Sequence, residues 1–458
     1  MIKLISSIVF VLFCFFANCQ TQLNDSVIAA SFFSKSLTDD WAINNLEYLV
    51  TSFPKRLCGT KAVSEAVKWS EKTLKELGAD TIFRQDLMVL HWDRGAQEKG
   101  FIESKQFGKN KINVCALGNS VSTVQNGITA EVLEVQNFEE LQKLGTENIK
   151  GKIVFFNRAM DPKFFYTFQA YGGAANQRTK GASEAAKYGA IAVIVRSLTL
   201  SNDTFPHTGV MRYDTNYAKI PAFCVSTFHA DQLSNQLKKD SKLKIYLESS
   251  CTMLPEEKSC NIISELKGTE FPNEYITIGG HIDCWDNSAG AHDDGSGIIH
   301  SMEVLKLFKD LGIKPRHTIR IVMFMDEEMD QRGAKKYAEY AEKNKEKHIA
   351  AIESDRGGAS PIGFSLDVND TIYNKVMLWQ KLFNNYGFYQ FIKGGSGVDI
   401  GPLKKFGTPL FAIMPDSQRY FDYHHCANDT FDKVNKRELQ LGSAGIALLV
   451  YLIDKYGL

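Results

Sequence analysis

Histidine and acidic residues follow four apolar segments of the chain, and their types suit a metal site. In chain order these are His281, Asp283 and Asp293 after YITIGG, Asp326 to Glu328 after TIRIVMFM, Asp355 after HIAAIES, and His424 and His425 after TPLFAIM. If the segments are neighbouring parallel strands, their carboxyl ends meet at one edge of a sheet. Imidazole and carboxylate groups are ligands that zinc prefers. The pattern therefore predicts a metal centre at that edge.

The acidic pair Glu327–Glu328 adds a second indication of chemistry. Two adjacent carboxylates are usually solvated surface charges, but here they follow a segment that reads as a buried strand. In that place they repel each other unless a cation or a proton compensates them. The pair therefore favours a metal together with a base of raised pKa. The DDGSG segment at Asp293 is typical of many turns, and it gains weight from His281 upstream.

Alternating strands and helices from residue 257 to 458 are expected to position these groups. Apolar strands are expected near 275–280, 318–325, 348–354 and 408–414, and helices over 298–312 and 333–347. This order predicts an α/β fold with a mixed, mostly parallel sheet between layers of helices. Residues 25–90 carry helical periodicity, with one helix ending at the cap Gly78.

The middle of the chain has a different texture. Short strands are expected near 130–135, 152–157, 190–197 and 221–227, with a small-residue helix over 180–190. This segment has no paired carboxylates and no histidine cluster, so we expect an inserted α/β module that serves as a lid or recognition domain. The predicted division is 1–19 as a signal peptide, 20–122 and 253–458 as the catalytic domain, and 123–252 as the insert.

The first residues indicate export. One lysine precedes an apolar run from Leu4 to Phe16, and small residues follow it before Gln20. The alternatives are an uncleaved membrane anchor, for which the run is shorter than the roughly 20 residues a bilayer needs, and lipid modification at Cys19. Seven cysteines remain after the signal. Cys251 and Cys260 are the expected disulfide if one forms.

Charge composition limits the partners. Lys+Arg and Asp+Glu are equal at 53 each, so no strongly basic surface is expected for nucleic acid or an anionic membrane. No membrane span is expected in the mature chain. Recognition is therefore expected to be local to the site.

Five motifs together carry a family resemblance: GGHIDCWD, GAHDDGSG, MDEE, ESD and YHHCANDT. In this order and spacing they resemble the dinuclear-zinc peptidases of family M28. The segments HWDRG, PHTGVMRY and KIPAF bring the chain closer to a carboxypeptidase subgroup of that family. The resemblance implies a zinc-exopeptidase fold, and the insert resembles a protease-associated (PA) domain.

The resemblance also implies a ligand set for two Zn²⁺ ions per chain. His281 and Asp355 would hold one ion, Glu328 and His425 the other, and Asp293 would bridge them. His425 is preferred to His424 because Asp429 lies four residues after it, as in the family pattern. A cis peptide between Asp293 and the next residue is implied as well.

Other residues receive roles around the metals. The resemblance implies Glu327 as the general base and Asp283 as the acid that holds His281 in the correct tautomer. Asp399, Tyr423 and His424 are expected to contact the substrate, with Asp399 alternatively supporting the site from behind.

The implied protein is a secreted homodimeric zinc exopeptidase that hydrolyses short peptides, in particular dipeptides with free termini. An aminopeptidase is the nearest alternative, because the same metal core serves both activities. A non-catalytic receptor or binding relative is the alternative from another class.

Overall fold

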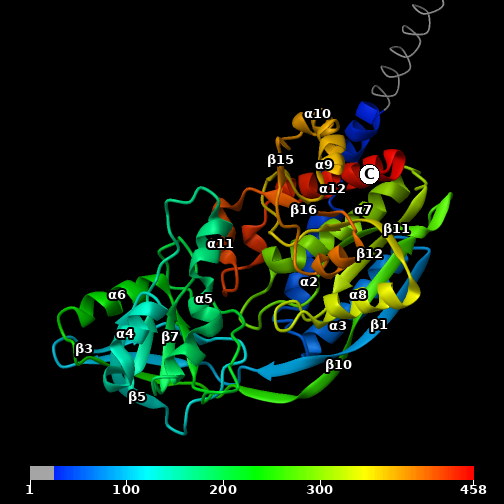
Figure 1. Ribbon diagram of the computed structural model, residues 1–458. Helices are drawn as coiled ribbons and strands as arrows, with labels where there is room; N and C mark the ends of the chain where they lie inside the picture. Colours follow the sequence, from blue (N-terminus) through cyan, green and yellow to red (C-terminus); the bar gives the residue numbers. More distant parts are fainter. Residues whose placement is uncertain (1–24) are drawn as a thin grey trace, which may run out of the picture.

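Two mixed β-sheets build two lobes, which Figure 1 shows side by side. A computed structural model describes residues 25–458. The expected signal peptide, residues 1–19, lies outside the described residues. The chain enters the second lobe after strand β1 (Thr81–Asp93) and returns through strand β10 (Thr252–Leu266). These two long strands pair antiparallel and connect the lobes.

The first sheet has eight strands in the order β1-β10-β12-β11-β13-β16-β14-β15. Its central strands β12, β11, β13 and β16 are parallel, and β10 and β14 pair antiparallel with the outer two of them. This confirms the expected mixed α/β architecture. The remaining bounds are β11 Phe271–His281, β12 His317–Phe324, β13 Lys347–Glu353, β14 Pro361–Asp367, β15 Gln390–Lys393 and β16 Leu410–Pro415.

Isoleucines fix the register of the central strands. Ile276 and Ile278 of β11 lie opposite Ile319 and Ile321 of β12, and all are fully buried. Parallel strands that are covered on both faces read as continuous apolar runs, as these do. The same register brings the end of β11 level with the end of β12, because His281 pairs with Phe324.

Helices cover both faces of this sheet (Figure 1). Helices α2 (Trp41–Ser52), α3 (Lys61–Glu76), α7 (Ser296–Asp310) and α12 (Lys436–Tyr456) share one hydrophobic core, which helical residues 25–37 also join. Helix α8 (Arg332–Asn344) packs on the opposite face. Neighbouring residues of β10 show the alternation of a strand, since Ile262 faces the α7 side and Ile263 faces α8.

Short elements complete the first lobe. Helix α9 contributes Val376 to the core that β14 and β15 also join. The segment from β16 to α12, which carries the histidine pair, consists of short turns of helix. The bounds are α9 Asp370–Met377, α10 Gln380–Asn384, η1 Ala291–Gly295, η2 Gly401–Phe406, η3 Ser417–Arg419, α11 Tyr420–Tyr423 and η4 Phe431–Lys433.

The second lobe contains the other eight-stranded sheet, in the order β3-β2-β9-β5-β6-β7-β8-β4. Its strands β5 to β8 are parallel neighbours and carry its apolar core. The bounds are β2 Lys99–Ser104, β3 Gly108–Ile112, β4 Val114–Ala116, β5 Ile128–Val135, α4 Phe138–Ile149, β6 Ile153–Phe156, α5 Thr167–Ala186, β7 Ala192–Arg196, β8 Ala222–Val225, α6 Thr227–Leu237 and β9 Lys244–Glu248.

The structure differs from the sequence-based expectations in two stretches. Strand β1 occupies 81–93, where helical periodicity was expected to continue to 90; it pairs along nearly its whole length with β10, and this tertiary pairing decides its conformation. The second sheet begins at Lys99, whereas the insert was expected from residue 123. The strands β2 to β4 are short and partly polar, so their sequence gave little indication of a new sheet.

The expected disulfide does not form. Cys251 directly precedes β10 and Cys260 lies within it, so an extended backbone separates them by about 30 Å. A disulfide needs Cα atoms within about 7 Å. All cysteines of the described part are unpaired and buried.

Among residues 25–458, no helix combines the length and the apolar character that a bilayer-crossing span requires.

Candidate metal centre

The predicted ligands come together at the carboxyl edge of the first sheet. His281 is the last residue of β11, Glu327 and Glu328 follow β12, and Asp355 follows β13. Asp293 lies in the turn η1 at the start of α7, and the histidine pair follows α11. Strand ends of a parallel sheet open onto a common crevice, which explains why residues far apart in sequence meet here.

Asp293 lies between two pairs of ligand-type side chains. One of its carboxylate oxygens, Oδ1, is 3.2 Å from His281 Nε2, which in turn is 3.3 Å from Asp355 Oδ1. The other oxygen, Oδ2, is 3.3 Å from His425 Nε2, which is 3.2 Å from Glu328 Oε2. Asp293 therefore offers one oxygen to each of two His–carboxylate pairs.

These separations fit zinc coordination. Two nitrogen or oxygen ligands bound to zinc at about 2.0–2.1 Å in tetrahedral geometry are about 3.3 Å apart. The four close distances around Asp293 match that spacing. Buried ligand atoms at the site also lack hydrogen-bond partners within the described chain, namely His281 Nε2, Asp293 Oδ2 and Glu328 Oε1. Buried polar atoms without a partner cost free energy, so a bound cation fits here.

Both outer histidines are oriented by main-chain carbonyls. His281 Nδ1 lies 2.9 Å from the carbonyl oxygen of Asp283, and His425 Nδ1 lies 3.3 Å from that of Thr208. A carbonyl only accepts, so these contacts favour the tautomer with the proton on Nδ1; at His425 the Arg178 guanidinium, a donor, also lies 3.5 Å from Nδ1. The Nε2 lone pair is then free for a metal.

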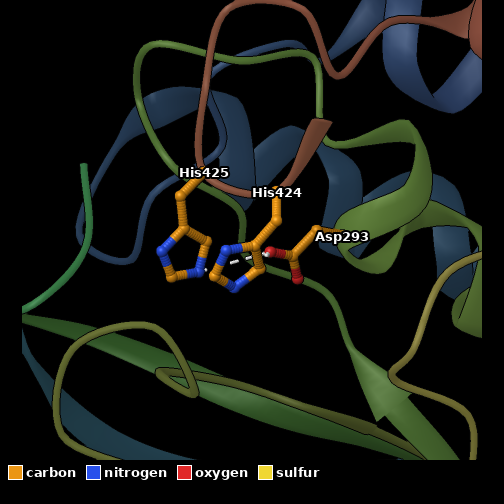
Figure 2. Close-up of side chains that lie close together, drawn as sticks. All are labelled: Asp293, His424 and His425. Carbon is orange, nitrogen blue, oxygen red and sulfur yellow. Dashed lines mark ion pairs between the residues drawn. The ribbon is translucent and has the colours of Figure 1, made fainter. Parts of the chain in front are cut away.

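His424 is placed differently from His425. The two rings stack with centroids 3.5 Å apart, and Figure 2 shows both near Asp293. His424 Nε2 is 3.9 Å from Asp293 Oδ2, longer than the corresponding 3.3 Å for His425. Burial lowers the pKa of His424 to about 3, so the ring is neutral. Distance thus favours His425 as the ligand and leaves His424 beside it.

The family resemblance implied that the carboxylate of Asp283 holds His281, but this carboxylate makes no hydrogen bond to the ring. Its Oδ1 is 3.9 Å from His281 Nδ1, and its main-chain oxygen takes the hydrogen bond instead. The carboxylate accepts the backbone N–H groups of Asp326, Glu327 and Glu328 at 2.9, 3.3 and 3.4 Å. Asp283 therefore fixes the turn that carries the acidic pair.

Glu327 lies near the predicted metal ligands but belongs to neither of the two His–carboxylate pairs around Asp293. Its Oε2 is 3.9 Å from His281 Nε2. Burial raises the pKa of Glu327 well above its ordinary value, and the charges of Asp355 and Asp293 add to this rise against the effect of His281. A carboxylate of raised pKa beside a metal site can accept a proton near neutral pH.

The segment around Asp293 is held by further carboxylates. Asp429 accepts the backbone N–H groups of His292 and Asp293 at 2.7 and 3.1 Å. Asp294 accepts those of His281 and Gly297, both at 3.0 Å. The Asp293–Asp294 peptide bond is cis, as expected.

Two supporting residues escaped the sequence analysis. The buried guanidinium of Arg56 donates to the carbonyls of Ile282, Ala289 and Gly290 at 2.7, 2.6 and 2.8 Å, and so shapes the loop between β11 and Asp293. Thr208 comes from the second lobe and exchanges contacts with His425 through its N–H at 2.9 Å and its carbonyl at 3.3 Å. Arg56 lies in no motif that could have indicated its contacts, whereas Thr208 lies within PHTGVMRY, a segment that carried only a family resemblance and no role for this residue.

The candidate substrate residues differ in their surroundings. Asp399 is fully buried, and neither carboxylate oxygen has a hydrogen-bond partner among described residues. Burial raises its pKa well above the ordinary value, with Glu353 and Glu327 adding to the rise. The carboxylate of Glu353 accepts hydrogen bonds from the backbone N–H groups of Val398 and Ile400, the two neighbours of Asp399 in the chain. Tyr423 stacks on His292 with centroids 5.1 Å apart.

Comparisons with known proteins find similarity to peptidases. Residues 261–450 match peptidase family M28. Human carboxypeptidase Q is 31% identical over 411 residues, covering 89% of this chain and 84% of the relative. The crystal structure of a peptidase M28 precursor from Shewanella amazonensis superposes with a TM-score of 0.90 at 32% identity, covering 94% and 96% of the two chains. A zinc aminopeptidase from Bacillus subtilis shares the fold with a TM-score of 0.64 at 20% identity, covering 90% of this chain and 94% of the other.

Proposed function

Because the chain belongs to peptidase family M28, we propose that it is a secreted zinc-dependent exopeptidase that hydrolyses short peptides, in particular dipeptides with free termini. The observation that carries this proposal is the position of Asp293, one oxygen toward each of two His–carboxylate pairs. Similarity to carboxypeptidase Q over most of both chains supports the carboxypeptidase or dipeptidase form of the activity.

The same geometry supports two Zn²⁺ ions per chain. His281 and Asp355 would hold one, Glu328 and His425 the other, and Asp293 both. When bound, zinc supplies Lewis acidity toward the peptide carbonyl and toward the attacking water.

Glu327 is the proposed general base. Its carboxylate takes the proton of the attacking water and passes it to the nitrogen of the departing amine. The raised pKa suits both steps, because the group must gain and lose one proton in each turnover. Asp283 holds this carboxylate in place through the backbone of the turn.

The surrounding residues define the proposed pocket. Tyr423 and His424 form an aromatic wall beside Asp293, with His424 stacked on His425. Asp399 lies on the Glu327 side and contacts the substrate or supports the site electrostatically. The second lobe acts as a PA-like recognition domain, since it reaches the centre through Thr208. Export through the N-terminal apolar run and assembly into a homodimer complete the proposal.

An aminopeptidase is the second candidate, and the fold shared with the Bacillus subtilis zinc aminopeptidase favours it. A non-catalytic binding role is less well supported, because all five proposed ligand residues and the proposed base are present.

A dipeptide screen separates these functions. Purified zinc-loaded protein is incubated with free dipeptides and with the same dipeptides blocked at the amino or the carboxyl end. We expect the protein to cleave free dipeptides. Cleavage should be lost when zinc is chelated and when the carboxyl end of the dipeptide is blocked. Cleavage that tolerates the carboxyl block and not the amino block would favour the aminopeptidase, and no cleavage of any dipeptide with zinc bound would leave the binding role.

A further inference from the structure

A cleft of about 340 Å³ opens next to the Asp355 segment, between the start of α5 and the β14–β15–β16 edge of the first sheet. Its size falls in the range of small-ligand pockets. Arg356, which directly follows Asp355 in the chain, lines the cleft. Most of the other lining residues are apolar or aromatic. The lining residues that matter here are Arg356, Tyr166, Phe168, Ile362, Ile392 and Met414.

Arg356 lacks an anionic partner in the described chain. Its Nη2 donates to the carbonyl of Gly395 at 2.9 Å, and its guanidinium lies 5.6 Å from the Phe168 ring. Glu353 and Asp355 act on it only through space, and no described carboxylate lies within ion-pair distance. A guanidinium has five N–H donors in a fork that matches a carboxylate. Most of these donors therefore remain for a ligand.

The side chain is nevertheless held in place. Ser365 donates to the same Gly395 carbonyl at 2.7 Å, which fixes the acceptor. Phe168 stacks on Tyr420 at 5.3 Å and packs edge-on against Phe421 at 4.9 Å, so the aromatic wall is tied to the segment that carries the histidines. The other cation of the cleft, Lys393, is paired with Asp370. Arg356 is thus the one unpaired cation among the described lining residues.

We propose that this cleft binds the carboxy-terminal residue of the substrate, with Arg356 pairing with the free α-carboxylate and the apolar walls holding a large apolar side chain. This inference rests on the proposed exopeptidase function and specifies its substrates: short peptides with a free carboxyl end and an aromatic or aliphatic last residue. Arg356 directly follows Asp355 in the chain and acts on its carboxylate through space, which relates the cleft to the proposed metal centre.

The test compares alanyl-phenylalanine with alanyl-phenylalaninamide. The amide keeps the shape and loses the charge, and a hydrogen bond to a charged group is worth about 1.5–3 kcal/mol, or about tenfold to a hundredfold. We expect kcat/KM of the wild type to favour the free acid at least about tenfold. Arg356→Gln should lower this acid-to-amide ratio at least about tenfold, mainly through KM of the acid, and Arg356→Lys should fall between. Arg437→Gln removes the same charge from an exposed position of α12 and should keep the ratio.

A binding measurement covers the case in which Arg356→Gln misfolds. Calorimetry on zinc-loaded wild type should show tighter binding of L-phenylalanine than of L-phenylalaninamide. Equal binding of the two, equal hydrolysis of both dipeptides, or an unchanged ratio in folded Arg356→Gln would each overturn the assignment of the cleft while leaving peptidase activity intact. Absence of hydrolysis with zinc bound would overturn both the cleft assignment and the proposed function.

Discussion

Glu327 can be tested apart from the ligands because its closest carboxylate oxygen is 3.9 Å from His281 Nε2, outside the 3.2–3.3 Å spacing of the close pairs. Glu327→Gln keeps the shape and removes the proton acceptor. We expect kcat to fall about 10²–10⁴-fold, the usual contribution of general acid–base catalysis, with zinc content unchanged. Dipeptide kinetics and elemental analysis measure the two effects.

Glu339→Gln is the matched control, since Glu339 is exposed on α8. It should change neither quantity. A fully active Glu327→Gln variant that retains zinc would show that another group moves the proton.

The histidine pair gives a second test at the scale of single residues. His425 Nε2 is 3.2 Å from Glu328 Oε2 and 3.3 Å from Asp293 Oδ2, whereas His424 Nε2 lies farther from Asp293 Oδ2, at 3.9 Å. His425→Ala should therefore lose about one zinc equivalent per chain and most activity. His424→Ala should retain both zinc equivalents per chain and should change mainly KM. If His424→Ala loses zinc and His425→Ala does not, His424 is the ligand and His425 is its neighbour.

Residue types could be predicted from sequence to the extent that they follow strands. His281, Glu328 and Asp355 each follow an apolar run, so their convergence was foreseeable. The geometry around these residues could not be predicted from the sequence. Which oxygen of Asp283 faces His281 depends on the local path of the backbone, and Arg56 acts through carbonyls that any residue possesses.

Helix α7 carries a buried acid away from the metal centre, and its contact with residues 25–37 should make stability depend on pH. Glu303 is 1% exposed and accepts a hydrogen bond from Ser36 at 3.0 Å. Burial raises its pKa from 4.5 to about 7. The folded state thus binds this proton more tightly than the unfolded chain does. The resulting stabilisation is fully present below pH 4.5 and is lost as pH rises through about 7.

Glu303→Gln isolates this contribution, because glutamine is neutral and retains an acceptor for Ser36. A pKa difference of about 2.5 corresponds to about 3 kcal/mol. Denaturant unfolding of wild type and variant should therefore show a stability difference that shifts by about 3 kcal/mol in favour of the variant between pH 4.5 and 8. Parallel pH profiles for the two proteins would contradict the assignment.

Elements were predicted best where local pattern and tertiary environment agree. The strands β11, β12, β13 and β16 each contain a largely buried apolar run, so the sequence pattern and the structure coincide there. Strand β1 is instead defined by its partner β10, which lies more than 150 residues away in the chain. Local sequence contains no signal for such a pairing.

Zinc removal tests the whole molecule. The site gathers several carboxylates whose burial raises the pKa of Glu328 and Asp355, and a cation would offset their repulsion. A ligand at about a thousand times its Kd stabilises a protein by about 4 kcal/mol. Chelation should therefore lower the midpoint of the first thermal transition by several degrees and abolish dipeptide cleavage, and added zinc should restore both.

Chelator that has been saturated with zinc beforehand is the control for direct effects of the chelator on the protein. An unchanged transition and full activity after exhaustive chelation would exclude the dinuclear zinc centre.

The contact between Thr208 and His425 has a consequence for how this architecture can be modified. The second lobe supplies a carbonyl that lies 3.3 Å from Nδ1 of the proposed ligand His425, and the N–H of Thr208 donates to the carbonyl of the same histidine. Excising residues 99–248 to obtain a minimal protein would therefore remove contacts that support the proposed metal centre together with the lobe. Grafting a lobe from a relative would succeed only if the graft reproduces this one carbonyl, which makes the two lobes a single engineering unit.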